Sequence, residues 1–343
     1  MRAQLLNSIS ATIHDYREDD ELSIDSDRID KWVHQFNGEV QVPILCEMDH
    51  VLKKTYISKK ATKVFFEDLF KTQDLVGSDP CAFWKRATIF DIQRSGNSQK
   101  EMVALLNKII NNNCNLQSGN SEQSSSEEFI YLDDGLFTGN RIWRDLEGWI
   151  AGEAPKKAIV HVITIALHMG GHFYVLNKIE AAAKVAKKDI TIRFWRIFDL
   201  EDRKTYTDSS DVLRPCVTPD DPDVKEYVDG MTHELCLRKP GQVGNKAIYS
   251  SDDGRQLLER EFLLAGVKIR KMCPHLNESQ RPLGNSRLET LGFGSLFVTF
   301  RNCPNNAPLA LWAGDPWFPL FPRKTNSDTS LAKYKAMLDN IRW

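Results

Sequence analysis

The chain lacks the features that would place it in a membrane or outside the cell. No run of about 18 apolar residues occurs, and residues 1–10 hold no apolar signal-peptide core, so we expect neither membrane insertion nor secretion. The seven cysteines include no Cys-x-x-Cys pair, which favours reduced thiols and a cytoplasmic location. With 45 Lys and Arg against 47 Asp and Glu, the net charge is -2, and no overall positive field indicates nucleic-acid binding.

The composition is that of a globular protein. Of the 343 residues, 41% are hydrophobic and 27% are charged, and this length can bury one large core or two ordinary ones. We expect one main domain with additions. Residues 1–80 are predicted as a helical cap or partner-binding region, residues 81–200 as the core, and residues 201–343 as the completion of the core with an aromatic-rich C-terminal region.

Strand-like and helix-like segments alternate through the middle of the chain. Residues 129–132 and 158–167 form apolar runs typical of buried parallel strands, and residues 87–93 and 190–197 are further strand candidates. Helical patterns connect most of them, which predicts an α/β protein with a doubly wound, mostly parallel sheet. Further on, we expect a helix that Gly266 ends and a strand directly after it.

Residues 129–142 combine a predicted strand, an acidic turn and a helix that begins at Thr138. The sequence is Phe-Ile-Tyr-Leu-Asp-Asp-Gly-Leu-Phe-Thr-Gly-Asn-Arg-Ile. Ligands of open α/β sheets bind at the carboxyl ends of strands, and amides at a helix N-terminus favour phosphate. Asp133 and Asp134 are suited to accept hydrogen bonds from a sugar diol or to hold a hydrated Mg²⁺ ion. The alternative is an ordinary acidic turn with Thr138 as the helix N-cap.

Residues 133–139 resemble the phosphoribosyl diphosphate (PRPP) loop of type I phosphoribosyltransferases, in which two acidic residues, three residues and Thr-Gly follow an apolar run. The resemblance implies that Asp133 and Asp134 are catalytic, hold the ribose hydroxyls and bind Mg²⁺. It also implies a set of substrate-binding residues around the 5′-phosphate: Gly135, Phe137, Thr138, Gly139, Asn140 and Arg141. The sequence departs from the family pattern at Phe137, where many members have an acid or Thr, and at Arg141, where a Thr or Ser is usual.

A second polar loop precedes this motif. In the resembled family such a loop holds the diphosphate through backbone amides, which implies substrate contacts from Arg94, Ser95, Gly96, Asn97 and Ser98. An ordinary strand-to-helix turn with Ser98 as N-cap explains the pattern equally well. Residues 111–128, which follow, contain no Lys or Arg, so a solvated linker is favoured over a catalytic lid.

His168 and His172 flank Gly170 and Gly171. Histidines four residues apart would face one metal ion on a helix, but the two glycines argue against a continuous helix there. For His168 two interpretations stay open, contact with the substrate at the rim of a crevice or a plain polar residue at the end of a strand.

The C-terminal region is rich in Pro, Asn and Trp. Residues 302–323 resemble a retron-associated branch of phosphoribosyltransferase-like proteins from bacterial conflict and anti-phage systems. This resemblance implies a defence (toxin) effector that binds PRPP or a nucleotide with Mg²⁺ and transfers or cleaves a phosphoribosyl group. It also implies a possible partner, a reverse transcriptase with its nucleic acid. The alternative is a catalytically inactive module that senses PRPP or a nucleotide or binds a partner.

Overall fold

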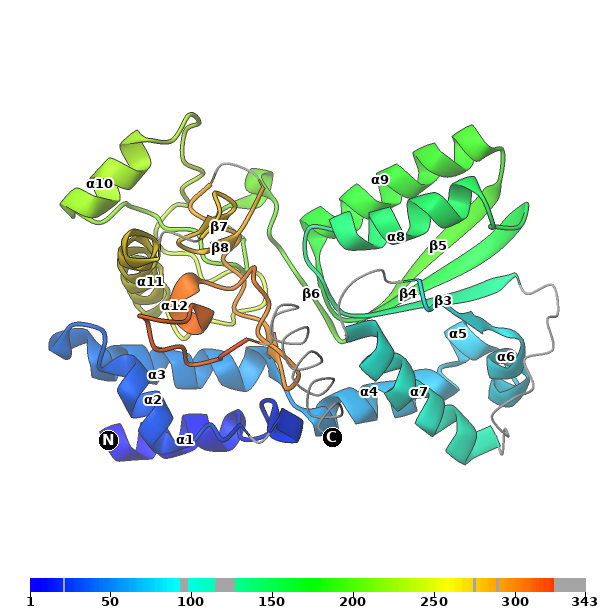
Figure 1. The fold of residues 1–343 in the computed structure, drawn as a ribbon, viewed down its shortest axis with the longest axis horizontal. Coiled ribbons are helices and arrows are strands. Elements are labelled where there is room, and N and C mark those ends of the chain that lie inside the picture. Colours follow the sequence, from blue (N-terminus) through cyan, green and yellow to red (C-terminus); the bar gives the residue numbers. More distant parts are fainter. Residues whose placement is uncertain (21, 93–97, 115–126, 274–275, 288–289, 324–343) are drawn as a thin grey trace, which may run out of the picture. The chain divides into compact units, whose positions relative to one another are not determined.

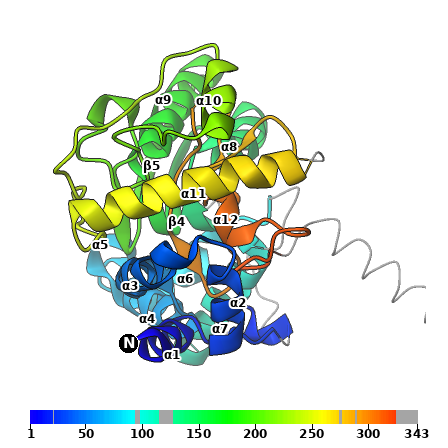
Figure 2. The same ribbon diagram turned by 90° about the vertical axis from the view of Figure 1, so that its left-hand side faces the viewer.

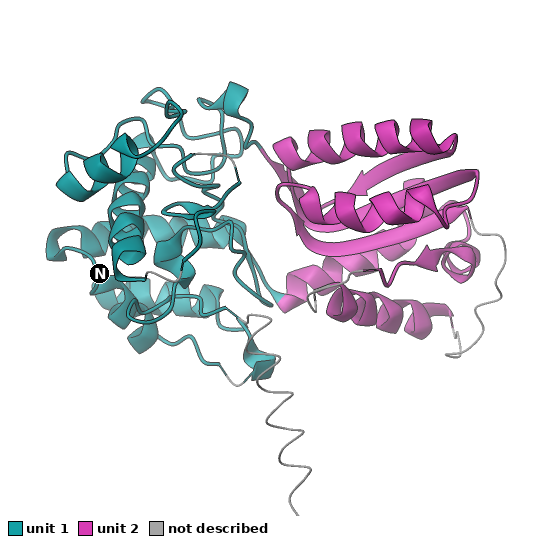
Figure 3. Ribbon diagram, turned by 45° about the horizontal axis from the view of Figure 1, so that its top comes forward, with its two compact units in different colours: residues 1–58, 201–343 teal, residues 59–200 magenta. Residues whose placement is uncertain are grey.

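The computed structural model describes residues 1–20, 22–92, 98–114, 127–273, 276–287 and 290–323. The chain divides into two compact units (Figure 3). Unit 1 comprises Met1–Ser58 and Glu201–Trp343, and unit 2 comprises Lys59–Leu200. No helix in these described ranges combines the length and the hydrophobicity that a bilayer span requires.

Unit 2 is built on a parallel sheet. Its strands are β2 (Thr88–Ile89), β3 (Glu128–Leu136), β4 (Lys157–His168), β5 (Asp189–Trp195) and β6 (Phe198–Leu200). The strand order is β2-β3-β4-β5, and β6 pairs with β4 beyond the end of β5. Every pairing among these strands is parallel, which confirms the predicted α/β class.

Helices cover both faces of this sheet, which is why its central strands are apolar on both sides. The helices are α4 (Lys59–Lys71), α5 (Gln73–Val76), α6 (Pro80–Arg86), α7 (Ser98–Cys114), α8 (Asn140–Ala151) and α9 (Met169–Ala186). Figure 1 shows α8 and α9 on one face and α4 to α7 on the other. The core beneath α8 and α9 contains Phe129, Tyr131, Leu146 and Trp149.

The third strand is longer than predicted. We expected it to end at Leu132, but β3 continues to Leu136 because β4 offers backbone partners along its whole length, with Asp133 opposite Thr164 and Leu136 opposite Leu167. The acidic pair thus lies within the strand, and the connection to α8 is only residues 137–139. The strand predicted at residues 87–93 is limited to the two residues of β2.

A disulfide joins Cys81 and Cys114, so the prediction that all seven cysteines are reduced is wrong. The first turn of α6 and the last residue of α7 bring the two Cα atoms to 5.5 Å, a distance typical of disulfides. The two cysteines are 33 residues apart in sequence. No short-range motif could therefore indicate the pair.

Unit 1 is mainly helical with irregular connections. Its helices are α1 (Arg2–Thr12), α2 (Ser26–Val33), α3 (Gly38–Thr55), α10 (Pro222–Asp229), α11 (Asp252–Met272) and α12 (Leu309–Trp312), with 3₁₀ turns η1 (Glu18–Asp20) and η2 (Lys204–Tyr206). Its short strands are β1 (Tyr56–Ile57), β7 (Gln280–Arg281), β8 (Gly284–Asn285) and β9 (Val298–Thr299). Figure 2 shows α11 as a long helix, which packs against α3.

The two sequence segments of unit 1 share one core. The Trp32 indole Nε1 donates a hydrogen bond to the Ala310 carbonyl at 2.8 Å, and the Tyr16 hydroxyl donates to the Pro322 carbonyl at 2.9 Å. Both donors are fully buried, because residues 278 and 306 positions away in the sequence cover them. The unit therefore depends on contacts that no local sequence pattern encodes.

The strand predicted after Gly266 is wrong, because α11 runs without interruption to Met272. A Cβ atom at position 266 would lie 2.6 Å from the Pro282 Cα atom. The glycine thus serves close packing of α11 against the β7 region and does not end the helix.

Candidate functional site

The acidic pair lies near the carboxyl end of β3, a strand with neighbours on both sides. The Asp133 side chain is 3% exposed, whereas Asp134 is half-buried. Although successive strand residues alternate between faces, the Asp134 side chain is close enough to raise the pKa of the Asp133 carboxyl by its charge and by a hydrogen bond. A single ligand or cation at the end of the strand can therefore contact both carboxylates.

Asp133 is held in an environment that disfavours its charge. The Asp134 amide donates a hydrogen bond to Asp133 Oδ1 at 2.9 Å, and Arg141 Nη1 lies 3.8 Å from Asp133 Oδ2. Burial raises the pKa of the Asp133 carboxyl to about 7, the negative charge of Asp134 adds to this rise, and Arg141 opposes it. A cation or a ligand hydroxyl beside Asp133 would therefore stabilise its ionised form.

The loop after β3 leads directly into the N-terminus of α8. Gly139 is the N-cap with φ +75°, a left-handed conformation, and a Cβ atom there would lie 2.6 Å from Val175 Cγ2. As a glycine it offers no side-chain acceptor to the first-turn amides. Asn140 Nδ2 donates to Thr138 Oγ1 at 3.2 Å. The first turn of this 12-residue helix can thus direct backbone N–H groups at an anion.

Helix α9 packs against the loop between β3 and α8. The helix begins at Met169, so Gly170 and Gly171 lie in its first turn and do not interrupt it. His168 and His172 do not share one helix, as predicted, but the reason is that His168 belongs to β4. A Cβ atom at Gly171 would overlap the Phe137 carbonyl oxygen. Gly171 therefore permits the close approach of α9 to the loop, a role that sequence reasoning missed and that only a Gly-Gly pair directly after a strand could have indicated.

His168 is the last residue of β4 and is fully buried. Its ring stacks on Phe137 with centroids 4.8 Å apart, and its Nδ1 lies 2.9 Å from the Leu136 carbonyl oxygen. Because a carbonyl oxygen only accepts, Nδ1 carries the proton. Burial lowers the pKa of His168 to about 4, so the ring is neutral at pH 7. The structure places His168 behind Phe137 and not at an open rim, and contact of its ring with substrate stays a prediction.

Two further residues of this region were not identified from the sequence. The buried Tyr131 hydroxyl donates a hydrogen bond to Asp145 Oδ2 of α8 at 2.7 Å and so ties β3 to the helix that follows the loop. Thr164 is the sheet neighbour of Asp133, and its buried hydroxyl has no hydrogen-bond partner among the described residues. The register of β3 against β4, which the sequence does not show, makes Thr164 part of the site.

The predicted diphosphate loop cannot be placed beside this site. Arg94, Ser95, Gly96 and Asn97 lie outside the described residues, as does most of the predicted linker at residues 111–128. Ser98 is the first residue of α7. The structure thus brings together the residues of the PRPP-loop motif, and the second loop stays a prediction.

The donors at the end of β3 suit a hard cation. Within the described ranges no group of three or more His, Cys, Asp or Glu side chains could hold a metal ion. Mg²⁺ needs fewer protein ligands, because it commonly binds one or two carboxylates together with water and substrate phosphates. Asp133 and Asp134 offer such oxygen atoms, and a cation there would offset the burial of Asp133. The residues present therefore fit Mg²⁺.

Comparison with known proteins agrees with this geometry. Curated proteins give no match. The sequence model of the PRTase-CE family matches residues 29–323, which include the parallel sheet, the acidic pair and most of unit 1. Because the match covers most of the sequence, the chain belongs to PRTase-CE, a family of phosphoribosyltransferase-like proteins of conflict systems.

Proposed function

We propose that the chain binds PRPP, or a related nucleotide, at the end of β3 and transfers or cleaves its phosphoribosyl group as an effector of anti-phage defence. The observation that carries the proposal is the set of ligand-binding groups at the end of β3. A buried carboxylate, a half-buried carboxylate and a glycine-capped helix N-terminus lie within seven residues of one parallel strand and its loop. Membership of PRTase-CE supports the same ligand class.

Each part of the site has a role in this proposal. Asp133 and Asp134 accept hydrogen bonds from the ribose hydroxyls. The first-turn amides of α8, together with the Thr138 hydroxyl and the half-exposed Arg141 guanidinium, contact the 5′-phosphate. Gly171 and His168 act indirectly, because they fix the position of Phe137. Mg²⁺, when bound by the two aspartates, would neutralise charge on the diphosphate leaving group.

Phosphoribosyl transfer needs little covalent chemistry from the protein. The sugar becomes positively charged as the diphosphate departs, so carboxylates fixed beside the ring stabilise the transition state. At physiological pH an ionised Asp133 costs free energy when the site is empty, and that cost falls when positive charge develops beside it. The ionised Asp133 carboxylate thus lowers the free energy of the charged transition state relative to that of the empty site.

Phe137 favours the alternative, a module that binds PRPP or a nucleotide without turnover. It takes the position at which many members of the resembled family carry an acid or Thr, and its ring is stacked on a neutral, buried histidine. That position therefore offers no group that could remove a proton from an acceptor.

Diphosphate release tests the two functions against each other. The full chain would be incubated with PRPP and Mg²⁺, with water or a panel of nucleobases and nucleotides as acceptors. Release that disappears in the Asp133→Asn/Asp134→Asn double variant supports the enzyme. Saturable binding without release supports the sensor, and absence of both binding and release contradicts the proposed site.

The finer biological assignments stay predictions. They are the retron association, the cytoplasmic location and a reverse transcriptase partner with its nucleic acid. Co-purification of nucleic acid with the chain would support the partner. A chain that stays free of nucleic acid, even when the reverse transcriptase is co-expressed, would contradict it.

A further inference from the structure

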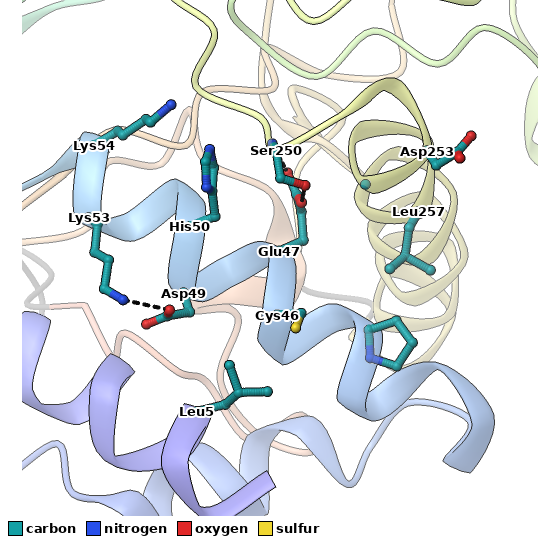
Figure 4. A pocket seen from close by; sticks show the side chains of 12 residues that line it. Leu5, Cys46, Glu47, Asp49, His50, Lys53, Lys54, Ser250, Asp253 and Leu257 are labelled. Atoms are coloured by element: carbon teal, nitrogen blue, oxygen red, sulfur yellow. Dashed lines mark hydrogen bonds and ion pairs between the residues drawn. The ribbon is translucent and has the colours of Figure 1, made fainter. Parts of the chain in front are cut away.

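Unit 1 contains a cavity of about 750 Å³ with walls from α3, the start of α11 and one residue of α1 (Figure 4). This volume lies within the range of roughly 300–1,000 Å³ that is usual for small-molecule sites. Leu5, Pro43 and Leu257 supply apolar walls, and the polar lining comes mainly from α3. None of its lining residues belongs to the β3–α8 loop.

Most charged groups of the lining are already engaged within the protein. Lys53 Nζ lies 2.6 Å from Asp49 Oδ2, and Lys54 Nζ donates to the Ala247 carbonyl oxygen at 2.5 Å. The buried Glu47 carboxylate accepts hydrogen bonds from the Ser250 amide, at 2.9 Å, and from the Ser250 hydroxyl. Figure 4 shows Glu47 directed at Ser250. The contacts of Lys54 and Glu47 hold α3 against residues 247–250, which precede α11, and few charges are left for a ligand.

Two other atoms of the same lining are not engaged. Asp49 Oδ1 and His50 Nε2 are buried and have no hydrogen-bond partner among the described residues. Buried polar atoms are almost always paired in native proteins, so two orphans on adjacent residues of one cavity wall need a cause. The carboxylate oxygen accepts, and the imidazole nitrogen donates or accepts according to its tautomer. A ligand that carries both a donor and an acceptor would satisfy them.

The net charge of the lining argues against an anionic ligand. Glu47, Asp49 and Asp253 carry negative charge, and only Lys53 and Lys54 carry positive charge when His50 is neutral. The excess of one negative charge disfavours a phosphate group. The apolar walls suit a flat ring, and the unpaired atoms suit a polar edge. We propose that this cavity binds an uncharged nitrogen heterocycle, a nucleobase or nucleoside without phosphate.

Binding requires only small movements of side chains. Both unpaired atoms have almost no exposed surface, whereas the His50 ring as a whole is partly exposed and the Asp49 side chain is 15% exposed. Rotation about the terminal side-chain bond turns His50 Nε2 in a new direction, and in Asp49 it exchanges the unpaired oxygen with the oxygen that contacts Lys53. The proposal does not rest on the proposed function, since a separate set of residues carries it.

Cys46 provides a direct readout, because it is an exposed free thiol that lines this cavity. Cys236 is a partly exposed free thiol outside the lining of this cavity and serves as an internal control. The full chain would be labelled with a maleimide in the presence of nucleobases, nucleosides or nucleoside 5′-monophosphates, and the labelling rate of each cysteine followed by peptide mass spectrometry. We expect at least one nucleobase or nucleoside at ten times its Kd to slow Cys46 labelling about tenfold, with no change at Cys236.

Variants separate binding from a general loss of structure. His50→Ala should weaken the protecting ligand about fivefold, since one hydrogen bond is lost, and His50→Gln should recover part of the affinity. His14→Ala, an exposed histidine outside the cavity, is the matched control. The Asp133→Asn/Asp134→Asn variant should keep full protection, so failure of the PRPP site and failure of this site are distinguishable.

Three results would overturn the proposal. The first is that no nucleobase or nucleoside slows labelling at Cys46. The second is that the 5′-monophosphates protect as well as the nucleosides, which would contradict the uncharged ligand class. The third is that folded His50→Ala protein binds as tightly as the wild type.

Discussion

Buried charges are arranged in opposite ways in the two units. In unit 1, Glu259 accepts hydrogen bonds from Arg238 Nη2 at 2.9 Å, from Arg255 Nε at 2.8 Å and from the Arg214 amide at 2.9 Å. Arg238 Nη1 also donates to Asp252 Oδ1 at 2.7 Å. In unit 2, the buried Asp133 has a second carboxylate as its chain neighbour and a guanidinium at 3.8 Å.

The pKa shifts show what this difference means. Burial alone would lower the pKa of Arg238, but the hydrogen bonds and charges of Glu259 and Asp252 outweigh it and the net shift is upward. For Asp133 the burial cost prevails and the pKa rises to about 7. The opposite charges around Glu259 therefore compensate one another, and the cluster stabilises the fold of unit 1. Asp133 is left with a cost that a ligand can relieve, which is typical of a functional site.

The largest expected effect comes from breaking the balanced cluster. Glu259→Gln should lower the free energy of unfolding by about 3–5 kcal/mol, because Arg238 and Arg255 would keep their charges in a buried site without their shared partner. Urea denaturation measures this. Glu67→Gln, which removes an exposed ion pair with Lys63, is the matched control and should change stability by less than about 0.5 kcal/mol. A loss below about 1 kcal/mol for Glu259→Gln is what an exposed ion pair would give. It would contradict the claim that the charges around Glu259 stabilise the fold, in contrast to Asp133.

The disulfide of unit 2 should have the next largest effect. Cys81→Ser/Cys114→Ser should destabilise unit 2 by about 3–4 kcal/mol, because the bond closes a loop of 33 residues and restricts the unfolded chain. Hydrogen exchange measured helix by helix should show faster exchange in α6 and α7 and unchanged exchange in α11. Equal acceleration in α11 would mean that the two units do not unfold independently.

A change at Asp133 should have the opposite sign to the change at Glu259. The carboxyl pKa is raised from 3.8 to about 7, so the folded state holds the proton more tightly and the wild type loses stability as pH rises from about 4 to about 7. Asp133→Asn avoids that loss and should be more stable than the wild type by about 1–3 kcal/mol at pH 8, with the difference vanishing near pH 4. Thermal or urea unfolding across this pH range tests it. A variant less stable than the wild type at pH 8 would show that Asp133 is a structural residue.

Arg141 should affect ligand affinity and not stability. Its side chain is half-exposed and 3.8 Å from Asp133, so Arg141→Gln should change the free energy of unfolding by no more than about 0.5 kcal/mol. Loss of a charge-assisted hydrogen bond to phosphate should weaken PRPP binding about tenfold, and Arg141→Lys should recover part of it. Isothermal titration calorimetry gives the affinities. Unchanged affinity in Arg141→Gln would place the 5′-phosphate elsewhere.

Sequence patterns predicted those parts of unit 2 that local rules determine. The apolar runs of β3 and β4 were identifiable because strands buried on both faces need continuous apolar side chains, whereas β5, whose residues are all partly exposed or exposed, was predicted as a further strand. The extension of β3 through Asp133 to Leu136 was not, because Asp and Gly are poor strand formers and backbone pairing with β4 outweighs that preference. The acidic pair was therefore identified, but its placement within a strand was not.

Unit 1 was less predictable because its contacts are distant in sequence. The Trp32–Ala310 hydrogen bond, the packing of Gly266 on Pro282 and the cavity between α3 and α11 all join segments that carry no local signal of their proximity. The same reason explains why the disulfide was missed and why Gly171 was taken as a helix breaker. Glycine at a close approach and glycine at a helix end look alike in a single sequence.

The most direct test of the central claim is a calorimetric titration of PRPP in the presence of Mg²⁺ into the wild type and into the Asp133→Asn/Asp134→Asn variant at pH 7.5. The account predicts saturable binding to the wild type and at least about a hundredfold loss of affinity in the variant, which remains folded. Equal affinity of the two proteins for PRPP would contradict the account.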